Sequence, residues 1–221
     1  LSKKEKDYLV KIHGIPSKKI LIWPLIRSEF EELNSFKKEK NPKDIIFIGG
    51  YRHTPNIEAV KLIEKDILPE VLKLFKKNGR SFPGIKLYGS SPSDYIKNLN
   101  SEHLSYEGYI ENESDAFAKA RISIAPLPFG AGLKGKTLSS LIYRTPIIGT
   151  SFALEGFEIH DSQLMVESSI DAVEFANSIY NSYINYENIE ARDWDNLIKK
   201  LEEKFSYSSF LKIMKDDINN I

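Results

Sequence analysis

The stretch RISIAPLPFGAGLKGKTLSSLIYRTPIIGT, residues 121–150, decides the fold of this chain. It opens with an apolar, β-branched run and closes with another, TPIIGT at 145–150, and both have the length of buried strands. Between them lies a glycine-rich loop, followed by KTLSSLIY at 136–143, whose apolar residues recur at helical spacing. A strand, a loop, a helix and a second strand in this order predict a βαβ unit of a parallel sheet.

The same alternation continues over most of the chain. The strand-like runs are continuously apolar, which is typical of strands covered on both faces, and we expect them at 19–25, 44–50, 85–89, 121–127, 145–150 and 163–167. Helical periodicity predicts helices at 56–78, 94–99, 114–120, 136–143, 169–183 and over most of 187–221. Pro69 is expected to kink or split the first of these helices. The chain is therefore predicted to be an α/β protein with a Rossmann-like, doubly wound parallel sheet.

Composition excludes several classes of protein. Lys and Arg number 31 and Asp and Glu also 31, so the chain lacks the basic excess of a general nucleic-acid binder. It has no cysteine, which rules out disulfides and thiolate metal sites, and its four histidines lack metal-ligand spacing, so no metal site is expected. No apolar run reaches the roughly 18 residues of a membrane span, and the first residues do not form a secretory signal. We therefore expect a cytoplasmic protein.

Ligands of a doubly wound sheet bind at the carboxyl ends of its strands. In IFIGGYRHTPN, Gly49 and Gly50 follow a strand and precede a helix start, whose backbone amides attract anions. Arg52 and His53 lie in the same loop and can add charge-assisted hydrogen bonds. The alternative interpretation is a plain turn in which the glycines only permit tight geometry. Neither GxGxxG nor GxxxxGK[ST] occurs, which argues against a nicotinamide enzyme or an ATPase.

A second candidate site lies in the opening stretch. Gly130 and Gly132 let a ligand approach the backbone, and Lys134 and Lys136 follow beside the expected helix start. On a helical wheel Lys136 lies roughly 160° from Leu138, so it points off the core, while Lys134 is expected in the loop. This arrangement predicts a phosphate site. The alternative is a solvated helix start with two ordinary surface lysines.

Four blocks of this sequence, at 44–60, 85–127, 130–157 and 206–218, resemble one known family in order and spacing. DIIFIGGYRHTPNIEAV is similar to its strand–glycine–PN opening, and GAGLKGKTLSSLIYRTPIIGTSFALEGF to its signature GxGxKxKxxEAxxxGxPvvxTxxxxEG. The segment IKLYGSSPSDYIKNL with the following HLSYEGYIENESDAFAKARISIAPL, and the closing SYSSFLKIMKDDI, match further blocks. The chain thus resembles the C-terminal, donor-binding domain of GT-B glycosyltransferases of family 4, also called group 1.

The resemblance implies one half of a GT-B enzyme, which binds a nucleotide-diphosphate sugar as donor substrate and needs no further cofactor and no bound metal. It implies transfer of the sugar to an acceptor, with retention, in glycan biosynthesis. Cations and helix amino-terminal amides stabilise the charge that develops on the leaving diphosphate. Carried onto this sequence, the residues that hold the diphosphate are Gly49, Gly50, Arg52, Lys134 and Lys136.

The sequence departs from the family pattern where related enzymes bind the sugar and the ribose. Ala131 and Ser139 stand in place of two glutamates, and Thr145 in place of a glycine. Ser139 can still hydrogen-bond a ribose hydroxyl as a shorter, neutral partner, and Glu155, in the matching EG position, is the candidate to compensate. The catalytic residues stay unassigned. A second hypothesis is therefore a catalytically incomplete module for nucleotide-sugar binding or regulation.

The resemblance also implies domain boundaries and partners. Residues 1–18 are expected to be a lead-in from a missing N-terminal acceptor-binding domain, supplied in cis or in trans, and residues 19–221 the donor-binding domain with its C-terminal helices. Without that acceptor domain the isolated chain is expected to be inactive. We expect a nucleotide-sugar donor as ligand, no nucleic acid, and either a cytoplasmic location or peripheral association of the full protein with the inner face of the membrane.

Overall fold

The computed structural model describes residues 3–23, 25–157 and 163–219. Its centre is a six-stranded sheet in the order β3-β2-β1-β4-β5-β6, in which every neighbouring pair is parallel. The strands are β1 (Asp44–Ile48), β2 (Ile85–Tyr88), β3 (Leu104–Gly108), β4 (Ala120–Ala125), β5 (Ile147–Gly149) and β6 (Met165–Glu167). The strand order reverses between β1 and β4, as in Rossmann-like folds, so the predicted fold class is confirmed.

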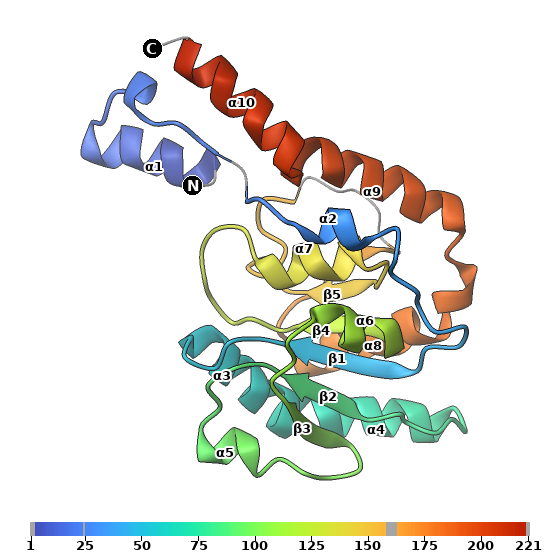
Figure 1. Ribbon diagram of the computed structural model, residues 1–221. Coiled ribbons are helices and arrows are strands. Elements are labelled where there is room, and N and C mark those ends of the chain that lie inside the picture. The colour runs from blue at the N-terminus through green and yellow to red at the C-terminus, as the bar shows by residue number, and fades with distance from the viewer. Residues whose placement is uncertain (1–2, 24, 158–162, 220–221) are drawn as a thin grey trace.

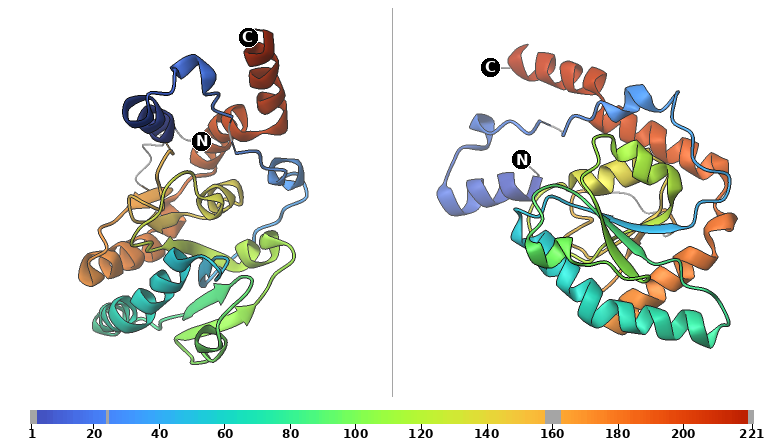
Figure 2. Two further views of the ribbon diagram at one scale, coloured as in Figure 1. Left: turned by 90° about the vertical axis from the view of Figure 1, so that its left-hand side faces the viewer. Right: turned by 60° about the horizontal axis from the view of Figure 1, so that its bottom comes forward.

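Helices cover both faces of this sheet, as Figures 1 and 2 show. The helices are α1 (Lys3–His13), α2 (Glu29–Glu32), α3 (Thr54–Leu62), α4 (Leu68–Lys77), α5 (Asp94–Lys97), α6 (Glu113–Lys119), α7 (Gly135–Ile142), α8 (Ala172–Ile184), α9 (Ala191–Phe205) and α10 (Tyr207–Asn219). Short 3₁₀ turns are η1 (Ser17–Lys19) and η3 (Tyr186–Asn188). Helices α4 and α8 pack against each other, and α8 also contacts β4 and β5, whereas α7 lies between β5 and α9. None of the described helices is both long enough and apolar enough to cross a membrane.

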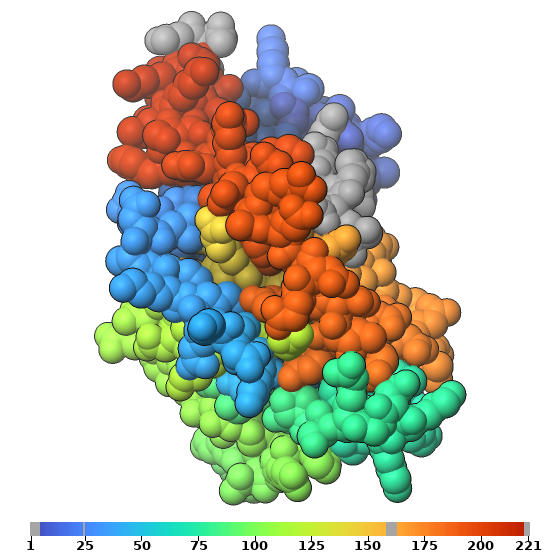
Figure 3. Space-filling model, turned by 90° about the vertical axis from the view of Figure 1, so that its right-hand side faces the viewer, coloured from blue at the N-terminus to red at the C-terminus, as the bar shows by residue number. Residues whose placement is uncertain are grey.

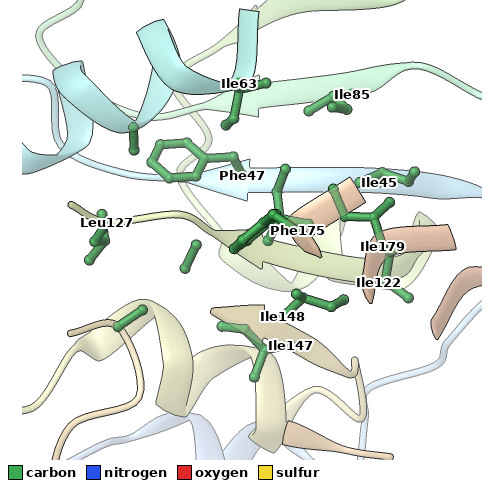
Figure 4. Close-up of a cluster of buried hydrophobic side chains, with 14 of the residues drawn as sticks. Ile45, Phe47, Ile63, Ile85, Ile122, Leu127, Ile147, Ile148, Phe175 and Ile179 are labelled. Carbon is green, nitrogen blue, oxygen red and sulfur yellow. The ribbon is translucent and has the colours of Figure 1, made fainter. Parts of the chain in front are cut away.

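Strand β1 explains why both faces are covered. Ile45 and Phe47 point into the larger buried cluster, while Ile46 and Ile48 join a smaller one on the other side. Alternate residues of a strand face opposite sides, so a continuously apolar strand needs helices on both. Figure 4 shows Phe175 of α8 lying among the isoleucines of the central strands.

The expected helix at 56–78 is continuous but changes its register. Five residues, η2 (Ile63–Ile67), form a π-helical turn, and α4 follows with Pro69 in its first turn. A proline inside a helix lacks the N–H that would bond back along the chain, and its ring crowds the preceding turn. The wider π turn accommodates it, so Pro69 alters the helix without splitting it.

The strand expected at 19–25 is absent from the structure, and this prediction is wrong for the described residues 19–23 and 25. Their apolar character serves another contact: the Trp23 ring packs edge to face on Phe210 of α10 at 5.6 Å, and its Nε1 donates to Asp217 at 3.1 Å. Conversely, β3 does not stand out in the sequence, because this edge strand mixes apolar residues with polar ones such as Glu107.

The two ends of the described chain lie on the same side of the sheet. Helices α1 and α10 project together beyond α7, and α3, α4 and α5 lie at the opposite side (Figure 1). In the space-filling view α9 occupies the middle of one face, between the segment that leads into β1 and α8 (Figure 3). Because all neighbouring strands are parallel, their carboxyl ends and the loops that follow them lie along one edge of the sheet, and the candidate site is found there.

Candidate functional site

A pocket of about 220 Å³ lies at the carboxyl edge of the sheet. Six segments build it: the turns after β1 and β2, the residues after β3, and the first residues of α3, α6 and α7. Its lining residues are Ile48, Gly49, Gly50, Asn56, Gly89, Ser90, Tyr109, Ile110, Glu113 and Lys136. Two glycines and one lysine of the sequence prediction are thus brought together here from positions more than eighty residues apart.

Two glycine turns form one wall of this pocket and lock against each other. The Gly49 N–H donates to the Tyr88 carbonyl at 3.0 Å, and the Tyr51 N–H donates to the Ser90 carbonyl at 2.9 Å. Gly89 has a φ of 142°, and a Cβ atom there would lie 1.8 Å from the carbonyl oxygen of Gly49. Only glycine allows these backbones to approach so closely.

Lys136 forms the base of the pocket. Its Nζ donates to Asn56 Oδ1 at 2.5 Å and lies 4.2 Å from the centre of the Phe47 ring, and Asn56 Nδ2 in turn donates to the Gly50 carbonyl at 2.8 Å. Burial lowers the pKa of Lys136 to about 7, against the opposing effect of the Glu113 carboxylate. Attraction to a bound anion would offset the free-energy cost of removing this ammonium group from water, so the pocket suits a negatively charged ligand.

The helical wheel correctly predicts that Lys136 points away from Leu138, but it does not show that this side of α7 faces a pocket. Helix α7 begins at Gly135, as expected, and Leu138 is fully buried, so Lys136 points away from that side of the helix. The turn after β1 covers the other side of α7. Lys136 therefore lies inside a pocket and is not an ordinary surface lysine.

The loop before α7 is held by its own polar groups. Lys134, the residue before the helix, donates from Nζ to the carbonyls of Ala131 at 2.7 Å and Gly132 at 2.6 Å, and burial lowers its pKa. Glu155 Oε2 accepts from the Gly132 N–H at 3.0 Å, and both Gly130 and Gly132 have positive φ values. In this structure Lys134, Glu155 and the two glycines shape the loop, and none of them lines the pocket.

Two further predicted residues lie on the surface beside the pocket. Arg52 and His53 are both exposed and neither belongs to its lining. His53 precedes α3 without capping it, and a Cβ atom on Gly50 would meet the His53 ring at 3.5 Å. The His53 side chain therefore flanks the glycine turn, and Arg52 lies between the two in the sequence.

Ser139 is separated from the pocket. It is fully buried in α7, its hydroxyl accepts a hydrogen bond from Arg27 Nη2, and it lies 3.5 Å from Glu29 Oε1. Arg27, in the segment before α2, forms an ion pair with Glu29, the first residue of that helix. The structure thus places the position expected to meet a ribose against another part of the chain.

Seven of the ten lining residues of this pocket are not among the site residues predicted from the sequence. Asn56, Gly89, Ser90, Tyr109 and Glu113 were not proposed as site residues, although each lies in a quoted family block. A signal existed for Gly89, because it directly follows the strand-like run IKLY and so belongs to the same edge as Gly49. The sequence offers no such signal for Glu113 and Tyr109, because β3, the strand that precedes them, is not predicted.

A larger pocket of about 620 Å³ lies further along the same edge, after β4, β5 and β6. Among the residues that the structure describes, its lining includes Phe152, Ile170 and Glu167 but no lysine or arginine. Volume alone does not identify a site for an anion. The smaller pocket, with its lysine and its two glycine turns, is the one suited to an anion and is therefore the candidate site.

A Rossmann-like sheet with glycine turns and a half-buried lysine at its carboxyl edge is typical of α/β proteins that bind phosphate-bearing ligands. The sequence profile of the family described as "Glycosyl transferases group 1" matches residues 42–185, which is 144 of 221 residues. The chain therefore belongs to the group 1 glycosyltransferases. A search of curated protein sequences finds no significant match.

Solved structures agree with this family. A glycosyltransferase from Rickettsia africae is similar with a TM-score of 0.74 and 12% identity, over 100% of this chain and 63% of that one. HepE of Anabaena, solved in complex with UDP and glucose, gives 0.70 and 12%, over 100% and 62%. TarM of S. aureus, a mutant solved with UDP among its ligands, gives 0.65 and 17%, over 98% and 47%. These likenesses show the GT-B fold, and the chain spans less than two thirds of each of these proteins.

Proposed function

We propose that this chain is the donor-binding part of a glycosyltransferase and holds the diphosphate of a nucleotide sugar in the pocket of about 220 Å³. The sugar would pass to an acceptor bound by a second domain, with retention of configuration, in glycan biosynthesis. Membership of the group 1 family and the UDP complexes of HepE and TarM support this proposal.

One observation carries the proposal: Lys136 presents a buried ammonium group beside the glycine turn of β1. A diphosphate offers oxygen atoms to this group and to backbone N–H groups of the turns. The same contacts stabilise the nucleoside diphosphate as it leaves, which is the electrostatic task of the reaction. The proposal includes no bound metal, so binding is expected to be the same with Mg²⁺ and with EDTA.

The first test is calorimetric titration of the folded chain with UDP, GDP, ADP, dTDP and their sugar conjugates. We expect at least one of them to bind, and Lys136→Ala to weaken that binding by about 1.5–3 kcal/mol, the range of a charged hydrogen bond. This equals a roughly 10- to 150-fold increase in Kd.

The matched control is Lys65→Ala, which removes an exposed lysine from the π turn η2 and should leave Kd unchanged. If the folded chain binds none of these nucleotides, the donor-binding proposal is wrong. If it binds one and Lys136→Ala has no effect, the diphosphate lies elsewhere.

Sugar transfer is a separate proposal from donor binding, because it requires the acceptor domain. We expect the 221-residue chain to bind donor without transferring sugar, and a longer protein with the acceptor domain to transfer it. If the longer protein binds donor but produces no glycoside with any acceptor or water, the chain is a module for nucleotide-sugar binding or regulation.

A further inference from the structure

The pocket contains an anionic group as well as a cationic one. Glu113, the first residue of α6, lines the pocket together with Lys136 and the Gly49 turn. Its carboxylate is close enough to Lys136 to raise the pKa of that lysine, in opposition to the stronger effect of burial. A ligand of this pocket therefore meets a hydrogen-bond donor at Lys136 and an acceptor at Glu113.

The Glu113 carboxylate lacks hydrogen bonds that it should have. Its Oε2 atom is buried and accepts no hydrogen bond within the described part of the chain. Arg27 Nη2 lies 3.6 Å away, which is too far for a hydrogen bond, although the charges still attract. A fully buried atom is out of a ligand's reach, so what a ligand meets is the rest of the Glu113 side chain, which lines the pocket and keeps 35% of its surface exposed.

The residues around Glu113 indicate which kind of ligand its carboxylate can bind. An ionised carboxylate only accepts hydrogen bonds, so the ligand must present hydroxyl or amine donors near its anionic part. Tyr109 also lines the pocket and has 69% of its surface exposed, which leaves an aromatic surface open to a flat base. A ribonucleoside diphosphate combines a base, two neighbouring hydroxyls and a diphosphate.

We infer that Glu113 binds the ribose hydroxyls of the donor nucleotide and makes the pocket selective for ribonucleotides over 2′-deoxyribonucleotides. The inference rests on the proposed function and deepens it. Ser139, the position expected to meet the ribose, is fully buried and bonded to Arg27. Glu113 takes over that task from a different helix, and Arg27 balances its charge while the pocket is empty.

The test compares UDP with 2′-deoxy-UDP by calorimetry, with the ADP and GDP pairs measured alongside. The wild-type chain should bind the ribonucleotide at least about tenfold more tightly, the effect of one hydrogen bond to a charged group. Glu113→Gln keeps the shape but removes the charge, and should bring the two nucleotides within about threefold of each other. Glu111→Gln, the same change at an exposed position two residues earlier, should retain the wild-type preference.

The outcomes separate this inference from the proposed function. If the wild-type chain binds none of the ribonucleotides, the donor-binding proposal itself fails and the inference falls with it. If binding depends on Lys136 but is equal for the two members of each pair, or if Glu113→Gln keeps the preference, only the inference about Glu113 is wrong. Circular dichroism and thermal unfolding of Glu113→Gln establish that the variant is folded.

Discussion

Lys136 acquires its properties from its neighbours, not from its own chemistry. Placed over the Phe47 ring and hydrogen-bonded to Asn56, its ammonium group has lost most of its water. Burial holds the pKa of Lys136 near 7, so that in the empty pocket the charge is about half present at neutral pH. A diphosphate beside it favours the charged form, and binding is therefore coupled to protonation of this one group.

This coupling predicts a pH dependence of binding. Because the bound state keeps the proton that the empty pocket loses above pH 7, affinity should fall as pH rises, by up to about tenfold per unit between about pH 7 and pH 9. A nucleotide sugar such as UDP-glucose is the proper probe, since its diester phosphates do not titrate in that window. Lys136→Arg, which stays charged, should flatten the profile. An equally steep profile in Lys136→Arg would show that another group titrates.

At the scale of elements, the candidate site depends on the turns after β1 and β2, which pack directly against each other. The turn after β1 and the turn after β2 are joined by two backbone hydrogen bonds and by the close approach of Gly89 to Gly49. Parallel neighbouring strands bring their carboxyl ends to the same edge, so both turns arrive there together. The pocket wall is therefore backbone, fixed by the sheet and independent of side-chain rotamers.

This predicts that Gly89→Ala damages both stability and binding. The added Cβ would lie 1.8 Å from the Gly49 carbonyl oxygen, so one turn must move, and we expect a loss of at least about 2 kcal/mol in the free energy of unfolding, with weakened nucleotide binding. Gly79→Ala is the matched control: it has a φ of 64° but nothing within 4 Å, so only the left-handed backbone costs energy, about 1 kcal/mol. Urea unfolding and calorimetry measure both effects. Equal losses in the two variants would contradict the close approach.

At the scale of the whole molecule, the segment between α2 and β1 is held against the turn between α7 and β5. Lys38 Nζ donates to the Arg144 carbonyl at 2.9 Å and to Thr145 Oγ1 at 2.5 Å, across more than one hundred positions of sequence. Arg144 adopts a left-handed φ of 50°. The left-handed residue of this turn therefore stands one position before Thr145, where the family has a glycine. Burial of Lys38 lowers its pKa to about 7.

The stability of the molecule should depend on pH through Lys38. The unfolded chain keeps the Lys38 proton to about pH 10.4, whereas the folded chain loses it near pH 7, so unfolding takes up a proton between these values and the free energy of unfolding rises with pH. We expect the difference between wild type and Lys38→Met to shift in favour of wild type by about 1–2 kcal/mol from about pH 7 to pH 9. The exposed neighbour provides the control variant, Lys37→Met. A difference that stays constant with pH would mean that Lys38 remains in water.

Much of the fold was predictable because it depends on local patterns. Five of the six strands, the helix starting at Gly135 and the long helix around Pro69 follow from continuous apolar runs and helical periodicity. The exceptions are informative. The strand expected at 19–25 is apolar because it packs on α10, and the edge strand β3 has too mixed a composition to be recognised.

The sequence by itself determined the class of sheet and the glycine turn of β1 and made Lys136 a candidate for the site, because strand ends and helix starts appear as patterns of consecutive residues. Only the tertiary structure decided which side chains share the pocket. In the folded chain Asn56 and Glu113 line the same pocket as Lys136. Lys134 and Glu155 instead form hydrogen bonds with the backbone of the loop before α7. Such neighbourhoods arise from strand order and helix packing between distant segments, which no local pattern records.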